Sequence, residues 1–427
     1  MEDFLENFRF SAKFNFGESG GRARTVQELL THSGLAWQEA CHLFLNTPLC
    51  DSPNRGRDDL RTLVANFHPG ATKDNVLITT GTSEALLLLF RYLNPKSVAL
   101  AVPAFQLLYE LPIALGAQII PLPVRWNSHG APFVDEDEWI DTLIKEKPSC
   151  LLINNPHNPS GLVLSSHFME KLSRTAEQIG CTLVGDEHYR FLSSEKDILG
   201  KTLYRQNNSS FVTGSFIKCL GAPGLRIGWC VGSQKALDSM QNEKNYTTHT
   251  VNPLSEWIAF EVLKNLESSL FKIMKEEWIV NKETLRAFLK SSQSICGIAP
   301  EGGLVTTLGF RNRNGDAKNI QKLLEKGIFV LPLSSMEFGK WDFQKEDISN
   351  TLSTKSSHEA RGAPCTKTQS GTQATQQRSA KTLWTAYKNE TASEINKGVG
   401  FRLGLGCSPK MFGEGLQAIE STISTNF

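Results

Sequence analysis

A lysine in a glycine-rich segment is the residue of this chain with the clearest chemical potential. Lys218 stands in the segment Ser215-Phe-Ile-Lys218-Cys-Leu-Gly221-Ala-Pro-Gly224-Leu-Arg226-Ile-Gly228. The glycines predict a rigid turn, and a lysine held on such a turn can form a Schiff base with an aldehyde-bearing cofactor. Ser215 and Arg226 offer a hydroxyl donor and a bidentate cation for a phosphate group. The spacing therefore predicts a cofactor lysine beside a phosphate site.

Three further polar side chains follow predicted strands. Asp186 ends the strand 181–186, where a buried carboxylate facing a pyridine nitrogen would keep that nitrogen protonated and make the ring an electron sink. Tyr189 can donate to the phenolic oxygen of the same ring. Asn158 lies in a turn whose two Asn-Pro steps favour a stiff, extended backbone. Together with Lys218, these residues predict pyridoxal 5'-phosphate as the cofactor.

Three more segments add candidate binding groups, each with a plainer interpretation. Gly81, Thr82 and Ser83 begin a predicted helix, where backbone N–H groups, hydroxyls and the helix dipole attract an anion. Phe105 follows another strand and can stack on the cofactor ring, or be an ordinary core aromatic. Arg402 lies among apolar neighbours, so it needs a partner: a substrate carboxylate or a structural salt bridge.

These residues need a scaffold of parallel strands that end at one edge. Short apolar runs alternate with helical patterns such as 83–93 and 165–179, which predicts an α/β fold: a mostly parallel, seven-stranded sheet covered by helices on both faces. Ligands gather at the carboxyl ends of strands in such sheets. The predicted strands are 76–80, 97–102, 119–124, 149–154, 181–186, 210–215 and 227–231.

The rest of the chain predicts a smaller α+β domain. Residues 46–290 form the predicted cofactor-binding domain, closed by a long helical connector over 255–290, and residues 291–427 form the small domain with 1–45. Strands are expected at 304–310, 327–331 and 401–405. An insertion at about 340–397 is poor in large apolar residues and is expected to be disordered. It is a surface insertion, a gene-model artefact or a regulatory segment.

Composition limits the function classes. With 45 basic against 44 acidic residues, the net charge of +1 gives no electrostatic reason to expect nucleic acid or a membrane as partner. The nine cysteines contain no CxxC pair, and neither cysteines nor histidines show metal-ligand spacing. The beginning of the chain is acidic and has no apolar signal core. We therefore expect a cytoplasmic protein without a metal site.

Taken in this order, the segments resemble the class I/II aminotransferase family of pyridoxal-phosphate enzymes, fold type I, from roughly residue 50 to the end of the chain. The resemblance implies a homodimer with active sites at the subunit interface. It implies that Lys218 is the Schiff-base lysine and that Asp186 pairs with the pyridine nitrogen. Asn158 and Tyr189 would then face the ring's phenolic oxygen. The remaining implied contacts are stacking by Phe105, phosphate binding by Thr82, Ser83, Ser215 and Arg226, and carboxylate binding by Arg402.

The chain also departs from the family pattern. Where members commonly carry a tyrosine that reaches the neighbouring subunit's phosphate, this chain has Asp51, and Leu333 replaces a usual glycine. The segment Gly17-Glu-Ser-Gly20-Gly21 also differs; Gly20 is a candidate substrate contact. Asp51-Ser-Pro and Asp186-Glu-His-Tyr-Arg-Phe-Leu look more like the capreomycidine synthase subgroup, which eliminates a hydroxyl from a hydroxyarginine and closes a ring. Asp51 or Glu18 would suit a guanidinium, and His188 is either an acid for hydroxyl loss or a structural histidine.

We therefore expect a pyridoxal-phosphate enzyme that acts on an amino acid through Lys218 and deprotonates its Cα, with amino-group transfer as the broad assignment. One alternative is elimination and cyclisation of a hydroxyarginine-type substrate. The other is a catalytically silent binding protein, which Asp51, Leu333 and the insertion motivate. The cofactor motifs do not choose between the reactions, because the same lysine and aspartate serve both.

Overall fold

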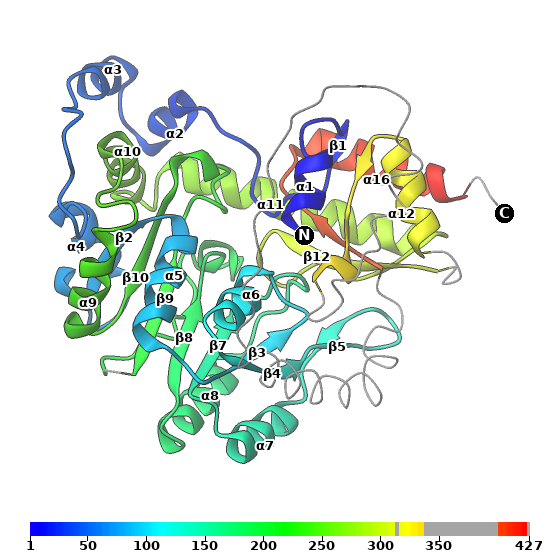
Figure 1. Cartoon of the computed structure of the whole chain (residues 1–427). Coiled ribbons are helices and arrows are strands. Elements are labelled where there is room, and N and C mark those ends of the chain that lie inside the picture. Colours follow the sequence, from blue (N-terminus) through cyan, green and yellow to red (C-terminus); the bar gives the residue numbers. More distant parts are fainter. Residues whose placement is uncertain (208, 312–315, 337–399, 425–427) are drawn as a thin grey trace, which may run out of the picture.

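The computed structural model describes residues 1–207, 209–311, 316–336 and 400–424 of the chain. Its main sheet contains β2 (Val76–Thr80), β3 (Ser97–Val102), β4 (Gln118–Pro123), β7 (Cys150–Asn154), β8 (Thr182–Asp186), β9 (Ser210–Gly214) and β10 (Ile227–Val231). The seven strands lie in the order β2-β10-β9-β8-β7-β3-β4. Strand β10 runs antiparallel to both of its neighbours, β2 and β9, and the other six strands run in one direction. The predicted mostly parallel seven-stranded sheet is therefore confirmed (Figure 1).

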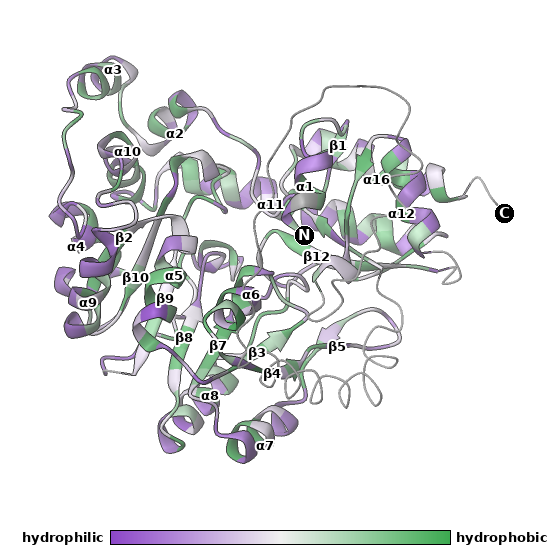
Figure 2. Cartoon of the chain, viewed as in Figure 1, coloured by the Kyte–Doolittle hydropathy of each residue, from purple (hydrophilic) through white to green (hydrophobic). Residues whose placement is uncertain are grey.

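Alternating side chains of these strands enter two separate cores, since successive residues of a strand point to opposite faces. In β2, Leu77 packs into one cluster, while Val76 and Ile78 belong to the other. Both faces are thus apolar and need helices over them. Figure 2 shows hydrophobic residues, in green, along the strands of this sheet. The first face is covered by α5 (Gly81–Leu93), α6 (Leu107–Ala114) and α9 (Gln234–Lys244); the second by α4 (Asp58–Asn66), α7 (Glu136–Glu146), α8 (Ser166–Gln178) and α10 (Pro253–Leu263).

A smaller antiparallel sheet carries the residues after the long helix α11 (Ser269–Ser291). It contains β11 (Ile295–Gly297), β12 (Val305–Phe310), β14 (Leu331–Pro332) and β15 (Phe401–Gly404), in the order β11-β12-β15-β14. Helices α12 (Asp316–Glu325) and α16 (Pro409–Ser424) contact each other beside it. A further short pair, β5 (Arg125–Trp126) and β6 (Pro132–Phe133), follows β4.

The first 45 residues of the chain contact elements beside the small sheet and helices that pack on the main sheet. Helix α1 (Glu2–Phe8) leads to β1 (Phe14–Asn15), which pairs in parallel with β13 (Ile328–Phe329) near α16 (Figure 1). Helix α2 (Val26–Ser33) instead contacts α10 and α11, and Phe44 of α3 (Trp37–Leu45) lies edge-on to Trp257 of α10. The predicted segment 1–45 therefore contacts both parts, and the domain boundaries at 45 and 290 stay predictions.

Two expected elements are divided in the structure. The helical stretch predicted over 255–290 is two helices, α10 and α11, because Asn265 folds the chain into a turn in which its side chain accepts from the backbone N–H of Glu267 (3.1 Å). The strand predicted over 327–331 is divided into β13 and β14, which pair with different strands. The expected strands at 304–310 and 401–405 are β12 and β15.

The insertion predicted at about 340–397 lies outside the described residues. Within the described ranges, no helix combines the length and apolarity that crossing a membrane requires, and no three metal-binding side chains gather. The eight cysteines that the structure describes are free thiols.

Candidate active site

Lys218 lies on the turn that connects the end of β9 to β10, at the carboxyl edge of the main sheet. The segment around Gly20 packs against this turn: the backbone N–H of Gly21 donates to the carbonyl oxygen of Lys218 (2.7 Å). A Cβ on Gly221, whose φ is +66°, would stand 1.7 Å from the carbonyl oxygen of Arg22. Only glycine permits this close approach, so the predicted glycine-rich turn holds Lys218 against the chain's first segment.

The carboxylate of Asp186 is buried at the end of the neighbouring strand β8 (2% exposed). It accepts from Asn154 Nδ2 (3.1 Å) and Thr213 Oγ1 (3.3 Å), and it contacts His188 Nδ1 (3.1 Å). No lysine or arginine lies within ion-pair distance of it among the described residues. His188, a candidate acid in the sequence, thus has its Nδ1 against Asp186; its role in hydroxyl loss stays a prediction.

Ser19 joins Lys218 to Tyr189. Its hydroxyl accepts from Lys218 Nζ (3.0 Å), and its carbonyl oxygen accepts from the Tyr189 hydroxyl (2.5 Å). The Tyr189 ring lies 4.2 Å, centroid to centroid, from the ring of His188. Sequence reasoning missed Ser19, although it singled out the glycine-rich segment in which Ser19 stands. Asn154 and Thr213 were also missed, because only the pairing of neighbouring strands brings them to Asp186.

Arg402 is buried on β15 (1% exposed) and points from the small sheet toward the same site. Its Nη1 donates to Asn158 Oδ1 (3.1 Å), and its Nη2 donates to the carbonyl oxygen of Gly17. Its Nε has no hydrogen-bond partner among the described residues. Asn158 is held in turn by its backbone N–H, which donates to Asn154 Oδ1 (2.7 Å). A buried guanidinium with a free donor is suited to an anionic ligand.

The start of α5 and the end of the Lys218 turn form a cradle. A Cβ on Gly81, whose φ is +77°, would lie 2.7 Å from Arg226 Nη2, and a Cβ on Gly228 would lie 2.5 Å from the backbone nitrogen of Thr82. Thr82 is half-buried and Ser83 is exposed. The exposed Arg226 has no carboxylate partner within the described chain; its Nη1 donates to the carbonyl oxygen of Pro223 (3.3 Å). The helix start and this cation together suit a phosphate.

The other predicted site residues are placed less centrally. Ser215 is buried, and its hydroxyl donates to the carbonyl oxygen of Ile227 (2.6 Å). Phe105 is half-buried and packs against two apolar clusters. Gly20 lies beside the Lys218 carbonyl: a Cβ on Gly20 would lie 3.7 Å from that carbonyl oxygen. Asp51 is exposed and accepts from Thr250 Oγ1 (3.4 Å), so within one chain it is not joined to the Lys218 group.

Burial sets the protonation of the site. It lowers the pKa of Lys218, and the positive charges of Arg402 and Arg226 act in the same direction. Burial also lowers the pKa of Arg402 and raises that of the Tyr189 phenol. Lys218 is therefore biased toward the neutral amine, which is the form that reacts with an aldehyde or takes up a proton. Tyr189 remains a hydrogen-bond donor.

The residues present fit pyridoxal 5'-phosphate. The buried Asp186 carboxylate, without a lysine or arginine partner in the described chain, matches a protonated pyridine nitrogen. The cradle of Gly81, Gly228 and Arg226 matches the phosphate. The Nζ of Lys218 matches the aldehyde.

Comparison with known proteins gives the same fold and chemistry. Residues 51–346 match the family described as aminotransferase class I and II. The chain is 27% identical to capreomycidine synthase of Streptomyces vinaceus over 339 residues, covering 78% of this chain and 85% of that protein. It is 24% identical to the aspartate/prephenate aminotransferase of Thermus thermophilus, covering 61% of this chain and 68% of that protein.

Two solved structures share the fold. A PLP-dependent aminotransferase from Streptococcus suis superposes with a TM-score of 0.77 at 18% identity, covering 99% of this chain and 96% of the other. A PLP-dependent cyclase, OrfR, superposes with a TM-score of 0.69 at 19% identity, covering 98% and 96%. Since the family model covers most of the chain, the protein belongs to the class I and II aminotransferases, pyridoxal-phosphate enzymes of fold type I that act on amino acids.

Proposed function

We propose that Lys218 holds the cofactor aldehyde, that Asp186 pairs with the pyridine nitrogen, and that the enzyme transfers the amino group of an amino acid. One observation carries this proposal: Lys218 and Tyr189 both donate hydrogen bonds to Ser19. His188 connects Tyr189 to Asp186, because its ring packs against the Tyr189 ring and its Nδ1 contacts the Asp186 carboxylate. The groups that the chemistry requires thus converge from separate segments of the chain. Gly81, Thr82, Ser83, Ser215 and Arg226 are proposed to hold the phosphate, and Phe105 to stack on the ring.

When bound, pyridoxal 5'-phosphate supplies an electron sink that stabilises negative charge at the substrate Cα. The protein supplies the rest. The Lys218 amine, biased toward its neutral form, would take the Cα proton at Nζ and, for amino-group transfer, would deliver it to the carbon that derives from the cofactor aldehyde. Asp186 holds the pyridine nitrogen protonated, and the Tyr189 and Asn158 side chains orient the ring oxygen. Arg402 binds the substrate carboxylate, and Gly20 is a further contact to the substrate.

The test starts with the purified protein and added pyridoxal 5'-phosphate. We expect a visible absorbance band and, after borohydride reduction, a cofactor mass on the peptide that contains Lys218. With an amino acid and a 2-oxo acid, we expect a new 2-oxo acid product. Absence of the band and of the labelled peptide in the unaltered protein would instead favour the catalytically silent binding protein.

A second candidate, elimination and cyclisation of a hydroxyarginine-type substrate, is favoured by the position of Glu18. Glu18 stands in the chain between Gly17, whose carbonyl oxygen accepts from Arg402, and Ser19, whose hydroxyl accepts from Lys218 Nζ (3.0 Å). Burial lowers the pKa of Lys218 and of Arg402, and the Glu18 carboxylate opposes both shifts. Its Oε1 already holds one guanidinium, at 2.9 Å from Arg9 Nε. Glu18 is therefore better placed within the chain than Asp51 to meet a cationic substrate tail.

Product analysis separates the two candidates. A 2-oxo acid formed from the amino acid excludes cyclisation as the main reaction, whereas a dehydrated product without amino-group transfer excludes transamination. Glu18→Gln should weaken the binding of arginine but not that of a neutral amino acid such as leucine. Equal effects on both would remove Glu18 from the substrate site.

We further propose that two copies associate through the face that carries Leu45, Leu49 and Tyr246, which are 78%, 78% and 91% exposed. Large exposed apolar side chains mark association surfaces, and Asp51 lies in the same region, bonded to Thr250. In the dimer Asp51 would act in the partner's site. Sedimentation of the protein, with Leu49→Glu as the disruptive variant, tests this.

A cytoplasmic location, inferred from the cysteine content, is tested by fractionation.

A further inference from the structure

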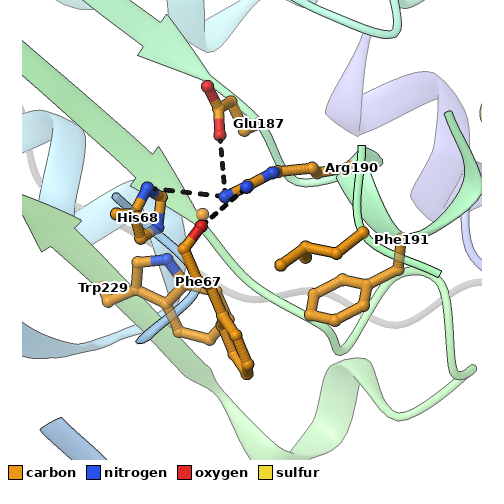
Figure 3. Close-up of a pocket in the computed structure, with 8 residues that line it drawn as sticks. Phe67, His68, Glu187, Arg190, Phe191 and Trp229 are labelled. Atoms are coloured by element: carbon orange, nitrogen blue, oxygen red, sulfur yellow. Dashed lines mark hydrogen bonds and ion pairs between the residues drawn. The ribbon is translucent and has the colours of Figure 1, made fainter. Parts of the chain in front are cut away.

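Two buried charged residues, Glu187 and Arg190, lie behind the segment that carries Asp186 and Tyr189. They line a small cavity together with Phe67, His68, Phe191, Leu199, Gly214 and Trp229 (Figure 3). The charged residues at this cavity, Glu187 and Arg190, stand on either side of His188 and Tyr189 in the chain. On the cofactor side, Asp186 contacts His188, the His188 ring packs against the Tyr189 ring, and Tyr189 donates to Ser19. Glu187 and Arg190 face the cavity instead.

Arg190 ties this segment to two distant parts of the chain. Its Nε donates to the carbonyl oxygen of Gly200 (2.6 Å), and its Nη2 donates to the carbonyl oxygen of Phe67 (2.7 Å), at the end of α4. Its Nη1 lies 3.5 Å from Glu187 Oε2 and 3.4 Å from His68 Nδ1. Because the guanidinium is planar and its donors diverge, it fixes all these groups in one geometry.

Glu187 ties the same segment to the loop at Thr202 and Leu203 and to strand β9. Its Oε1 accepts from the backbone N–H of Leu203 (2.6 Å) and from Thr202 Oγ1 (3.0 Å). Its own backbone N–H donates to the carbonyl oxygen of Thr213 (2.8 Å), the residue whose hydroxyl donates to Asp186 Oδ1. A displacement of Glu187 is therefore transmitted to Asp186 both along the chain and through Thr213.

We propose that Glu187 and Arg190 are positioning residues, which hold Asp186 and Tyr189 at the pyridine ring from the far side of the 186–190 segment. This inference rests on the proposed function, since it assigns Asp186 and Tyr189 to the cofactor. The side chains of the pair are 3% and 8% exposed. Removing one partner would leave a buried charge uncompensated, so the pair is best removed as a whole.

The test uses the full chain with the double substitution Glu187→Gln and Arg190→Met, which removes both charges. We expect it to fold, to bind pyridoxal 5'-phosphate about tenfold more weakly, as for the loss of one net hydrogen bond, and to shift the pH midpoint of the cofactor's visible absorbance. Arg190→Lys keeps the charge but reaches only one of the two carbonyls, so it should restore part of the affinity.

Arg205→Met is the matched control. Arg205 donates to the carbonyl oxygens of Thr202 and Tyr204 and pairs with Glu170, in the same region but on the surface. It should leave the cofactor affinity and the spectrum unchanged. A folded double variant whose affinity and pH midpoint equal those of the unaltered protein overturns the proposal.

Should the double variant not fold, Arg190→Lys alone decides, because lysine keeps a positive charge beside Glu187 while it reaches only one of the two carbonyl oxygens. A shifted absorbance midpoint supports the positioning role, and an unshifted one overturns it. Failure of the proposed function is a different result, since the unaltered protein would then show neither the visible band nor borohydride labelling of Lys218.

Discussion

Replacing Arg402 by methionine tests the assignment of the substrate carboxylate. Methionine keeps most of the apolar stem of the side chain and removes the guanidinium. In the structure, Arg402 Nη1 donates to Asn158 Oδ1 at 3.1 Å, while Nε has no partner in the described chain. A bound carboxylate would add two charge-assisted hydrogen bonds, worth roughly 1.5–3 kcal/mol each. Their loss should cost about 3 kcal/mol or more, or about 100-fold in affinity.

The same change has a structural cost. Asn158 Oδ1 and the carbonyl oxygen of Gly17 lose their donor in a buried place, which costs about 1–3 kcal/mol for each unsatisfied group. Thermal unfolding of each variant must therefore accompany the binding measurement. Arg402→Lys retains the positive charge without the bidentate geometry, and an intermediate affinity is expected.

The assay compares an amino acid with its α-carboxamide, in which the carboxylate charge is absent. Binding of L-aspartate and L-arginine is followed through the absorbance of the bound cofactor, each against its own α-carboxamide. In Arg402→Met the two acids should lose about 100-fold in affinity, whereas the carboxamides should lose little. An equal loss for acid and carboxamide would refute the reasoning and make Arg402 a structural residue.

Three other predictions follow from the same contacts. Lys218→Ala should abolish the visible cofactor band and borohydride labelling; a persisting band, measured by absorbance, would assign the cofactor to another amine. Gly228→Ala should weaken cofactor binding about tenfold or more in a fluorescence titration, because its Cβ would lie 2.4 Å from the backbone carbon of Gly81 and such overpacking costs roughly 1–3 kcal/mol. The control is Gly224→Ala, whose Cβ would meet nothing within 4 Å and which should bind the cofactor normally. Lys218→Met should stabilise the cofactor-free protein toward urea at neutral pH, because burial lowers the pKa of Lys218, and this gain should vanish as the pH rises through the unfolded lysine's value of about 10.4; a gain independent of pH would contradict a charge effect.

The strand assignments came from local patterns that tertiary context did not override. Runs such as 76–80 and 97–102 are apolar at successive positions and end at glycine, asparagine or proline, and they became β2 and β3 without change of bounds. The stretch 255–290, predicted to be helical and divided into two helices in the structure, shows the opposite case. Its helical composition continues across Asn265, but a side chain that bonds the backbone locally competes with the helix.

The residue types and their spacing predicted the chemistry of the site. Lys218, Asp186 and Gly81 could be named because each ends or follows an apolar run, and parallel strands place such ends at one edge. Arg226 precedes the antiparallel strand β10, which begins at the same edge. Which residues surround them depends on the tertiary structure. Ser19 reaches Lys218, and Arg402 reaches Asn158 and Gly17, from segments remote in the chain, because residues 14–15 and 401–404 are incorporated into sheets with distant strands. Hydrogen-bond partners of this kind depend on pairing between strands, and no local spacing encodes that pairing.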